Sequence, residues 1–288
     1  MTEYFNNLQK EVQTEQRPKA DRSHTMQNRT EESLLQEISP AELKRHISYL
    51  KNQKAAGPDE IPNEFIKAMQ SKARETLLHY LNRTLETLQV PQKWKKARIK
   101  LLHKGKGKPT DELESYRPIA VLSTVLKLLC TVINRRIQNY CEDSNKLADA
   151  QIGFRPNRRT SDHIFTLTQA VEMKHKDKSQ LFLAFLDMEK AYDTVPHAKM
   201  WDKLEKLNLE DGLIELIKEM YKDRTAIYEL DKYKSQEVNI NIGLKQGCPL
   251  SPTLFNIYIN ELLNTLDKEG AGLRCRPSRK TERKNIPK

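Results

Sequence analysis

Apolar residues along the chain recur mostly at helical spacing, which predicts a helix-rich protein with a few short strands. The clearest helix start is at 39–50, where Ser39 can cap the helix and Pro40 suits its first turn. Further helices are expected at 77–88, 126–137, 161–175, 198–208, 211–222 and 254–266. On the last of these, the face expected to be buried carries Leu254, Phe255, Tyr258, Leu262 and Leu266.

Strand patterns occupy shorter stretches between the helices. Residues 97–103 have a strand pattern that runs into a basic loop, and the segments "TAIYEL" and "EVNINI" at 225–230 and 237–242 predict two more strands. Residues 181–186, "LFLAFL", are six consecutive apolar residues between polar sequence, which is typical of a strand covered on both faces. The helices outnumber the strands and no internal repeat is seen, which indicates the α+β class.

The two ends of the chain differ from its middle. Residues 1–38 are polar without sustained periodicity and are expected to be a flexible lead-in. Residues 274–288 carry seven basic residues against one acidic residue, so 273–288 is expected to be a disordered basic tail. No apolar run approaches the length of a membrane span, and the start has no apolar signal core. The sequence therefore predicts an intracellular protein of the cytoplasm or nucleus without membrane association.

Charge and cysteine usage narrow the class of partner. The chain has 288 residues, and 50 Lys and Arg against 39 Asp and Glu give a formal net charge of +11. Such an excess suits a polyanion such as nucleic acid, although basic surfaces also serve solubility. The four cysteines show no C-x2-C spacing and the seven histidines no zinc pattern, which indicates reduced thiols and excludes a zinc-ribbon protein.

Asp187 raises the main chemical question, because it ends the apolar run at 181–186. A carboxylate there costs several kcal/mol to desolvate unless its charge is compensated. The acid can reach water at the strand terminus, or it can bind a metal ion where the strand meets a cleft. This stretch alone leaves both interpretations open. Glu189 and Asp193 follow in a turn, where acids are more often solvated or capping than ligating, and they stay unassigned.

Two basic segments are candidates for phosphate contact. In "KGKGK", Lys104, Lys106 and Lys108 alternate with glycines that allow the backbone to approach a phosphate closely, but such a loop can also be merely flexible and soluble. The second segment, "GFRPNRRT", carries Arg155, Arg158 and Arg159. It can touch a nucleic-acid backbone or form a solvated basic turn.

Taken together, six segments in this order resemble the reverse transcriptases of non-LTR (LINE-type) retrotransposons. They are "KAAGPDEIP", "LLHKGKGK", "YRPIAVLS", "QIGFRPNRRTSDHI", "FLDMEKAYD" and "GLKQGCPLSPTLFNIYINEL". The resemblance covers roughly residues 39–272. It implies a right-hand polymerase fold, with an N-terminal extension and fingers at 39–178 and a partial palm at 179–272. It also implies an enzyme that copies an RNA template into DNA from a DNA primer and deoxynucleoside triphosphates, with two Mg²⁺ ions and no obligate protein partner.

The resemblance carries roles to individual residues. Asp187 matches the family's first metal-binding aspartate, with the backbone carbonyl of Met188 as a further ligand. Tyr192 matches the ring that excludes a ribose 2′-hydroxyl, although ordinary packing would also explain it. Arg117 matches the triphosphate-binding arginine, with Lys104 and Lys106 nearby. Gln246 and Gly247 match the segment beside the nascent base pair. The residues expected at the template backbone are Lys108, Arg155, Arg158 and Arg159.

One family feature is missing from the sequence. Relatives follow the "QGCPLSP" helix with a hairpin that bears an aromatic-x-D-D pattern, but after Asn264 this chain has only the isolated acids Asp267, Glu269 and Glu282. Two hypotheses follow. The chain is a piece of a reverse transcriptase domain that lacks the second aspartate motif, or it is a catalytically inactive nucleic-acid-binding remnant of one.

Overall fold

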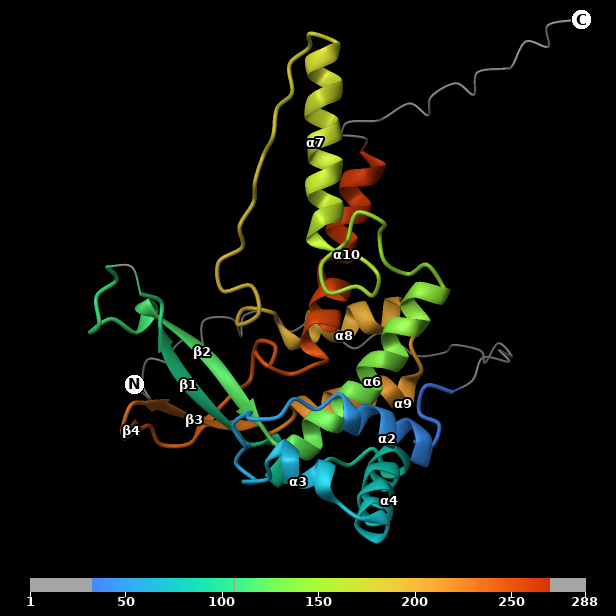
Figure 1. The fold of residues 1–288 in the computed structure, drawn as a ribbon, viewed down its shortest axis with the longest axis vertical. Coiled ribbons are helices and arrows are strands. Elements are labelled where there is room, and N and C mark those ends of the chain that lie inside the picture. The colour runs from blue at the N-terminus through green and yellow to red at the C-terminus, as the bar shows by residue number, and fades with distance from the viewer. Residues whose placement is uncertain (1–32, 106, 270–288) are drawn as a thin grey trace, which may run out of the picture.

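A mixed sheet lies at one side of the molecule, and most of the helices lie at the other (Figure 1). The computed structural model describes residues 33–105 and 107–269, so Lys106, most of the expected lead-in at 1–38 and the whole 273–288 tail lie outside it. The strands are β1 Ala97–His103, β2 Tyr116–Leu122, β3 Thr225–Leu230, β4 Tyr233–Lys234 and β5 Val238–Asn239. Helices and strands together confirm the α+β class.

The sheet joins segments that are far apart in sequence. Its order is β2-β1-β3-β4, with β5 pairing β3 beyond that path. β1 pairs antiparallel with β2, with Ala97 opposite Leu122, and parallel with β3, with Ala97 opposite Ala226. The predicted strands at 97–103 and 225–230 are confirmed. The strand predicted at 237–242 is shorter: β5 ends at Asn239, and Ile240 makes one further hydrogen bond in the same register, from its N–H to the carbonyl of Arg224.

The helices lie close to where the apolar spacing predicts them. They are α2 Pro40–Ser48, α3 Asn63–Ala68, α4 Ser71–Thr87, α5 Gln92–Lys95, α6 Thr124–Asp143, α7 Thr160–Lys176, α8 His197–Lys206, α9 Asp211–Tyr221 and α10 Ser251–Lys268. At the start of α2, the Ser39 hydroxyl accepts from the N–H of Glu42, as its sequence predicts. None of the helices in the described ranges is long and apolar enough to cross a membrane.

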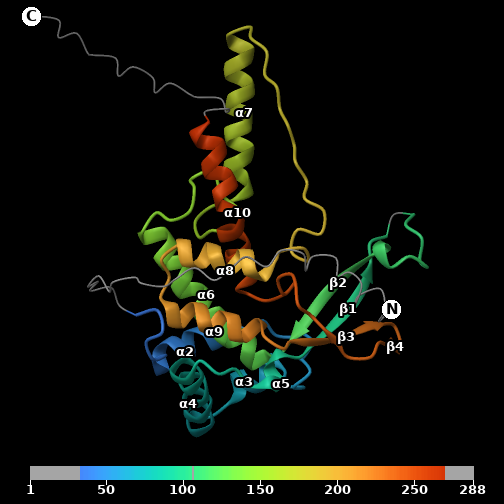
Figure 2. The same cartoon turned by 180° about the vertical axis from the view of Figure 1, so that it is seen from behind.

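The long helix α6 is the centre of the core. Leu126, Leu129 and Ile133 are fully buried, and α2, α5 and α10 contact the helix. α9 covers its other side, as a comparison of Figure 1 with the view from behind in Figure 2 shows, and there the Cys130 thiol lies 4.0 Å from the sulfur of Met220. Ser123 caps the helix by accepting from the N–H of Leu126. Of the described helices, α6 carries the largest set of buried residues.

A buried arginine connects α2 and the residues just before it to the core. Arg136 of α6 forms two hydrogen bonds to the carboxylate of Glu42 in α2, at 3.2 and 2.8 Å. The same guanidinium donates to the carbonyl oxygens of Leu34 and Gln36. Because a bidentate pair with a planar guanidinium fixes orientation as well as distance, α2 has one defined position on α6.

The strand predicted at 181–186 is wrong for the described chain. The segment is irregular, and Phe182 and Leu186 are 86% and 88% exposed. A strand requires a neighbouring strand for its backbone hydrogen bonds, and no strand of the described sheet pairs with this segment. Its apolar side chains therefore remain in solvent.

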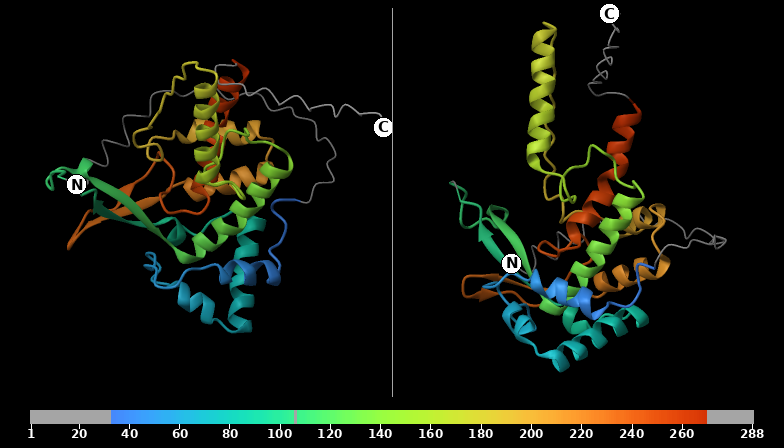
Figure 3. Two further views of the ribbon diagram at one scale, coloured as in Figure 1. Left: turned by 45° about the horizontal axis from the view of Figure 1, so that its top comes forward. Right: turned by 45° about the vertical axis from the view of Figure 1, so that its right-hand side comes forward.

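The helices near residues 181–186 also expose apolar side chains to solvent. The predicted helix at 161–175 is confirmed by α7, but α7 has no buried residue, and Figure 3 shows it standing clear of the body. Phe165 on this helix is 67% exposed. Leu262 and Leu266 at the end of α10, which were predicted to be buried, are about half exposed. α7, the segment 181–186 and the end of α10, at the top of Figure 1, thus have apolar side chains with few apolar neighbours.

A matched pair of substitutions tests this division between core and bare segment. Leu126→Ala should lower the free energy of unfolding by about 2–5 kcal/mol, because it opens a cavity at a fully buried site. Leu186→Ala should change it by less than about 0.5 kcal/mol, because that side chain is already in water. Urea unfolding followed by circular dichroism gives both values. A cost for Leu186→Ala comparable to that for Leu126→Ala would contradict the exposed position of 181–186.

Candidate functional site

Two of the six sequence segments meet at the middle of β2. The carbonyl oxygen of Gln246 accepts from the backbone N–H of Ala120 at 3.2 Å. Gly247 has φ +96°, and a Cβ at this position would lie 2.7 Å from the carbonyl oxygen of Ala120. A larger residue would be both strained and too close, so glycine is required for the loop 243–249 to lie against the strand.

The turn after the 181–186 segment packs on the same loop. Nε2 of Gln246 donates to both carboxylate oxygens of Asp193, at 3.1 and 3.3 Å. The N–H of Leu244 donates to the carbonyl of Tyr192 at 2.7 Å. Gly243, with φ +79°, is so close to Asp193 that a Cβ would lie 2.6 Å from its carbonyl oxygen. The turn, the loop and β2 therefore form one contiguous site.

Asp193 was left unassigned by the sequence and is a residue that sequence reasoning missed. Burial raises the pKa of its carboxyl, and the hydrogen bond from Gln246 and the charges of Lys190 and Arg224 act in the opposite direction. Its position as the second aspartate of "DMEKAYD" is a signal, but its partner lies 53 residues away. No local pattern could identify that contact.

Arg224 holds the start of loop 243–249 in place through hydrogen bonds to its backbone. Its guanidinium is buried and donates to the carbonyl oxygens of Ile240, Ile242 and Gly243, at 3.1, 2.5 and 2.6 Å. It lies over the ring of Tyr221 at 4.9 Å, a favourable cation–π distance. Burial lowers the pKa of Arg224 to about 10. Three carbonyl oxygens at the start of the loop are thus held by one side chain.

Lys245, a residue of the loop itself, adds a second buried cation. Its Nζ donates to the carbonyl of Met220 at 2.8 Å and lies 4.9 Å from the centre of the Tyr221 ring. Burial lowers the pKa of Lys245 to about 8. Two cations therefore share one aromatic ring below the loop that carries Gln246 and Gly247.

His197 of α8 completes this support. Its Nε2 lies 3.0 Å from the carbonyl oxygen of Gly243, and its ring contacts Tyr221 edge-on. Burial, with the nearby charge of Arg224, lowers the pKa of His197 to about 4. The imidazole is therefore neutral near pH 7 and donates its Nε2–H to the loop carbonyl.

The space under the loop is too small for a substrate. Asp193, Arg224 and Gln246 line a cavity of about 70 Å³ together with apolar side chains of the sheet. A pocket for a nucleotide-sized ligand occupies at least about 300 Å³. A ligand of this site must therefore bind on the outer surface of the loop and of β2, where Gly247 and Arg117 are exposed.

Tyr192 lies at the edge of the site with its ring stacked on Phe255 of α10. The ring centroids are 5.0 Å apart and the planes differ by 15°. The ring is half-buried, and burial raises the pKa of its hydroxyl. This is the contact expected if Tyr192 serves packing, and its role at a ribose remains a prediction.

Asp187 and Met188 lie in the exposed irregular segment. Within 33–105 and 107–269, no three His, Cys, Asp or Glu side chains come close enough together to hold a metal ion. Two magnesium ions need several carboxylate oxygens between them, so the donors in the described residues do not fit such a centre. The assignment of Asp187 and Met188 as ligands stays a prediction.

The basic loop between β1 and β2 lies at the far end of the strand pair (Figure 1). Lys104 donates from Nζ to the carbonyl of Glu114, and its N–H donates to that of Ser115. Lys108 is exposed, and Arg117 is exposed on β2 opposite Leu102. The structure thus brings Lys104, Lys108 and Arg117 to the same end of the sheet.

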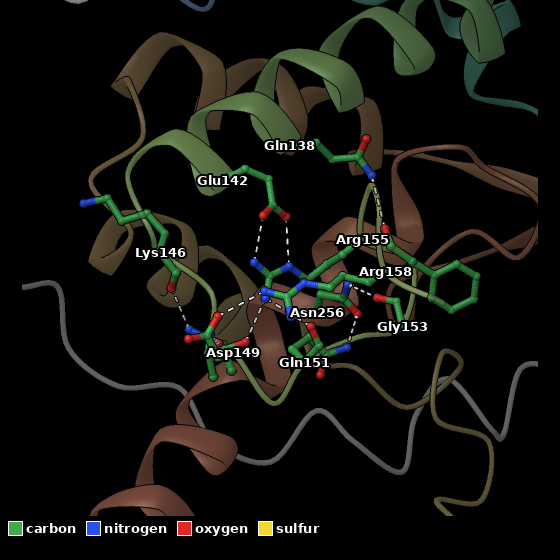
Figure 4. A network of polar contacts seen from close by, with 12 residues as sticks. Gln138, Glu142, Lys146, Asp149, Gln151, Gly153, Arg155, Arg158 and Asn256 are labelled. Carbon is green, nitrogen blue, oxygen red and sulfur yellow. Dashed lines mark hydrogen bonds and ion pairs between the residues drawn. The ribbon is translucent and has the colours of Figure 1, made fainter. Parts of the chain in front are cut away.

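The three arginines of "GFRPNRRT" have different environments. Arg155 is buried, and its guanidinium forms two hydrogen bonds to the carboxylate of Glu142, at 2.8 and 2.7 Å, and donates to the carbonyls of Ala148 and Gln151 (Figure 4). The hydrogen bonds to Glu142 raise the pKa of Arg155. Arg158 and Arg159 are exposed. The geometry gives Arg155 a structural role and leaves its two neighbours available to a ligand.

Two asparagines of α10 hold the same loop from the other side, and sequence reasoning missed both. Asn256 accepts from Nε2 of Gln151 at 2.8 Å and donates to the carbonyl of Gly153 at 2.7 Å (Figure 4). Asn260 accepts from the N–H of Ala148 and donates to the carbonyl of Lys146. Their signal is that two amides four residues apart lie on the buried side of an otherwise apolar helix.

Comparison with known proteins gives a consistent result. A sequence model of the family described as reverse transcriptase (RNA-dependent DNA polymerase) matches residues 102–275. The chain is 30% identical over 225 residues to the probable RNA-directed DNA polymerase from transposon BS of Drosophila melanogaster, a match covering 78% of this chain and 25% of that protein. It is also 30% identical over 229 residues to the RNA-directed DNA polymerase from mobile element jockey of the same organism, covering 79% and 25%.

The chain thus spans about a quarter of the length of these relatives. Among solved structures, a partial Cas6-RT-Cas1–Cas2 complex matches 85% of this chain and 38% of the solved one, with 16% identity and a TM-score of 0.42. That similarity is too distant to support an argument.

The different roles of the loop arginines can be separated by stability. Arg155→Ala should cost about 1–3 kcal/mol of unfolding free energy, because it leaves the Glu142 carboxylate and two carbonyls without their donor. Arg158→Ala should cost less than about 0.5 kcal/mol, because its ion pair with Asp149 is exposed. Both values come from urea unfolding. Equal small effects would contradict a structural role for Arg155.

His197 should make stability depend on pH. Between about pH 6.5 and pH 4 the unfolded chain binds a proton on His197 that the folded chain does not, so stability falls as pH falls through this range. His197→Gln should therefore lose about 1–2 kcal/mol less stability than the parent between pH 7 and pH 5. Identical profiles for parent and His197→Gln would contradict the neutral buried imidazole.

Proposed function

Because the chain belongs to the reverse transcriptase (RNA-dependent DNA polymerase) family, we propose that it is the fingers and part of the palm of a non-LTR retrotransposon polymerase. In this proposal residues 39–178 are the N-terminal extension and fingers, and 179–272 are the partial palm of a right-hand fold. The domain takes part in copying an RNA template into DNA from a DNA primer and deoxynucleoside triphosphates. Its place of action would be the cytoplasm or nucleus.

The observation that carries the proposal is the contact of Gln246 and Gly247 with both Ala120 and Asp193. The three segments involved are separated in sequence and are those whose counterparts in the family surround the incoming nucleotide. Their contacts are a backbone hydrogen bond between Ala120 and Gln246, a side-chain hydrogen bond from Gln246 to Asp193, and a close approach at Gly247 that nothing larger than glycine allows. A shared surface built in this way supports a common task for the three segments.

The exposed groups beside that surface suit a polyphosphate. Arg117 presents a planar guanidinium, which can bind two phosphate oxygens at once, and Lys104 and Lys108 add point charges at the same end of the sheet. Gly247 leaves its backbone accessible for close approach by a base. The side chain of Gln246 is occupied by Asp193, so we assign it to positioning the loop rather than to direct recognition.

Members of this family use divalent metal ions, which in a polymerase activate the primer oxygen and neutralise the leaving pyrophosphate. Asp187 would be one ligand here, with the carbonyl of Met188. The described residues do not complete the set, as shown above. We propose that a hairpin bearing the aromatic-x-D-D pair supplies the remaining carboxylates. It would also pair with 181–186, converting this exposed apolar segment into the strand that its sequence predicts.

A second function is favoured by the same incomplete donor set. A chain that keeps the basic groups but has one metal-binding carboxylate would bind nucleic acid without polymerising. This is the inactive remnant of a retrotransposon polymerase. The two functions share the binding surface and differ in catalysis, so one experiment addresses both.

The full chain of 288 residues should bind an RNA template annealed to a DNA primer, with affinity that falls steeply with salt because phosphate contacts release counterions. Replacing Lys104, Lys108 and Arg117 together by alanine should reduce the slope of log affinity against log salt by about two units. Fluorescence anisotropy across a salt series measures both. The chain should extend the primer no better than its Asp187→Asn variant in the presence of Mg²⁺.

Absent or salt-insensitive binding would overturn the proposed function. Primer extension that Asp187→Asn abolishes would establish the polymerase and contradict the incomplete donor set. If a chain carrying the aromatic-x-D-D hairpin after residue 288 extends the primer and its Asp187→Asn form does not, the first function holds over the remnant. If neither extends it, the remnant is favoured.

A further inference from the structure

Phe154 is an exposed aromatic residue with an unusual backbone conformation. Its side chain is 64% exposed, and its backbone has φ +56°. For a bulky residue this conformation is a genuine outlier that costs of order 1 kcal/mol or more, and it persists only where the surrounding structure imposes it. The chain therefore maintains an exposed ring at an energetic cost.

The residues around Phe154 show what imposes the conformation. Its carbonyl oxygen accepts from Nε2 of Gln138 in α6 at 3.3 Å. The preceding carbonyl, of Gly153, is held by Asn256 of α10, and the following side chain, Arg155, is buried against Glu142 (Figure 4). Contacts to two helices thus fix the backbone on both sides of the ring. A ring positioned in this way loses little further freedom when it binds something.

The charges near Phe154 indicate an anionic partner. Arg158 and Arg159 follow within five positions and are exposed. Nη2 of Arg158 lies 3.1 Å from Oδ1 of Asp149, whose side chain is 97% exposed. An ion pair this exposed contributes about 0–1 kcal/mol, so a phosphate can replace the carboxylate at small cost. Residues 157–160 of the loop are all polar, which is unlike the apolar surroundings of a protein-binding patch.

We propose that Phe154 stacks on an unpaired base of a single-stranded template, with Arg158 and Arg159 on the flanking phosphates. An exposed aromatic ring beside cations is the arrangement by which proteins bind single strands without reading their sequence, since every base has a π-face. The inference rests on the proposed function, because it takes RNA as the ligand. It adds a base-binding site to the phosphate contacts, and the template contact expected of the buried Arg155 is made by Phe154 instead.

Two single-stranded RNA ligands separate stacking from charge. One is a 12-nucleotide strand, and the other has the same backbone with the central bases removed. The full chain should bind the intact strand more tightly. Phe154→Ala should weaken that binding roughly 5- to 150-fold, the range for one stacked base, while leaving both the salt slope and the affinity for the abasic strand unchanged.

Three matched variants make the test specific. Phe154→Trp should keep the affinity, and its fluorescence should be quenched by the intact strand. Phe182→Ala, which removes a still more exposed ring from the irregular segment, should have no effect. Arg158→Ala should reduce the salt slope by about 0.7 on both strands. If Phe154→Ala fails to fold by circular dichroism, Phe154→Gly removes the same ring without backbone strain.

Several results would overturn the proposal. These are an unchanged affinity of the Phe154→Ala or Phe154→Gly chain for the intact strand, an equal loss on the abasic strand, or an equal loss for Phe182→Ala. In each case salt-dependent binding by the parent chain would leave the proposed function standing. If the parent chain binds neither strand in a salt-dependent way, the proposed function fails first and the stacking site with it.

Discussion

The buried guanidinium of Arg224 is the interaction on which the candidate site depends. The carbonyl oxygens of Ile240, Ile242 and Gly243, where the chain enters loop 243–249, all accept hydrogen bonds from this one side chain. A buried charge is costly, and here the oriented carbonyls and the face of Tyr221 offset that cost. With the loop fixed, Gln246 can reach Asp193 and Ala120 together, and Gly247 lies on β2. The site is therefore formed by backbone groups that a buried cation holds in place.

Two other buried arginines also donate to backbone carbonyls and so connect separate parts of the fold. Arg136 connects α6 to the N-terminal extension, and Arg155 connects the loop before α7 to α6. In each case one guanidinium takes both a carboxylate and backbone carbonyls, which an ammonium group could not do with the same fixed geometry. Part of the excess of positive charge is thus structural. The surface that remains for a polyanion is carried by a smaller set, including Lys104, Lys108, Arg117, Arg158 and Arg159.

Helix α7 and the segment 181–186 that follows it differ from the core, because few of their apolar residues are buried. α7 buries no residue, and the segment after it exposes Phe182, Phe185 and Leu186. Elements with few buried apolar contacts have low local stability, so this region can reorganise at little cost to the rest. The core around α6 does not depend on it. Asp187 lies in this region, so a strand that pairs with 181–186 would order the candidate ligand and bury the apolar run in the same step.

The sequence by itself determined most of the helices, the α+β class and the family. Apolar spacing located α2, α6, α8 and α9, because a helix satisfies its own backbone and its amphipathic period is local. The order of six short motifs indicated the reverse transcriptase family, which the family match confirms. Tertiary structure alone decided what depends on a distant partner. Residues 181–186 have a strand's composition, but a strand forms only where a neighbour accepts its hydrogen bonds. Arg155 and Arg158 look alike in sequence, and only the position of Glu142 on the folded α6 makes one structural and leaves the other exposed.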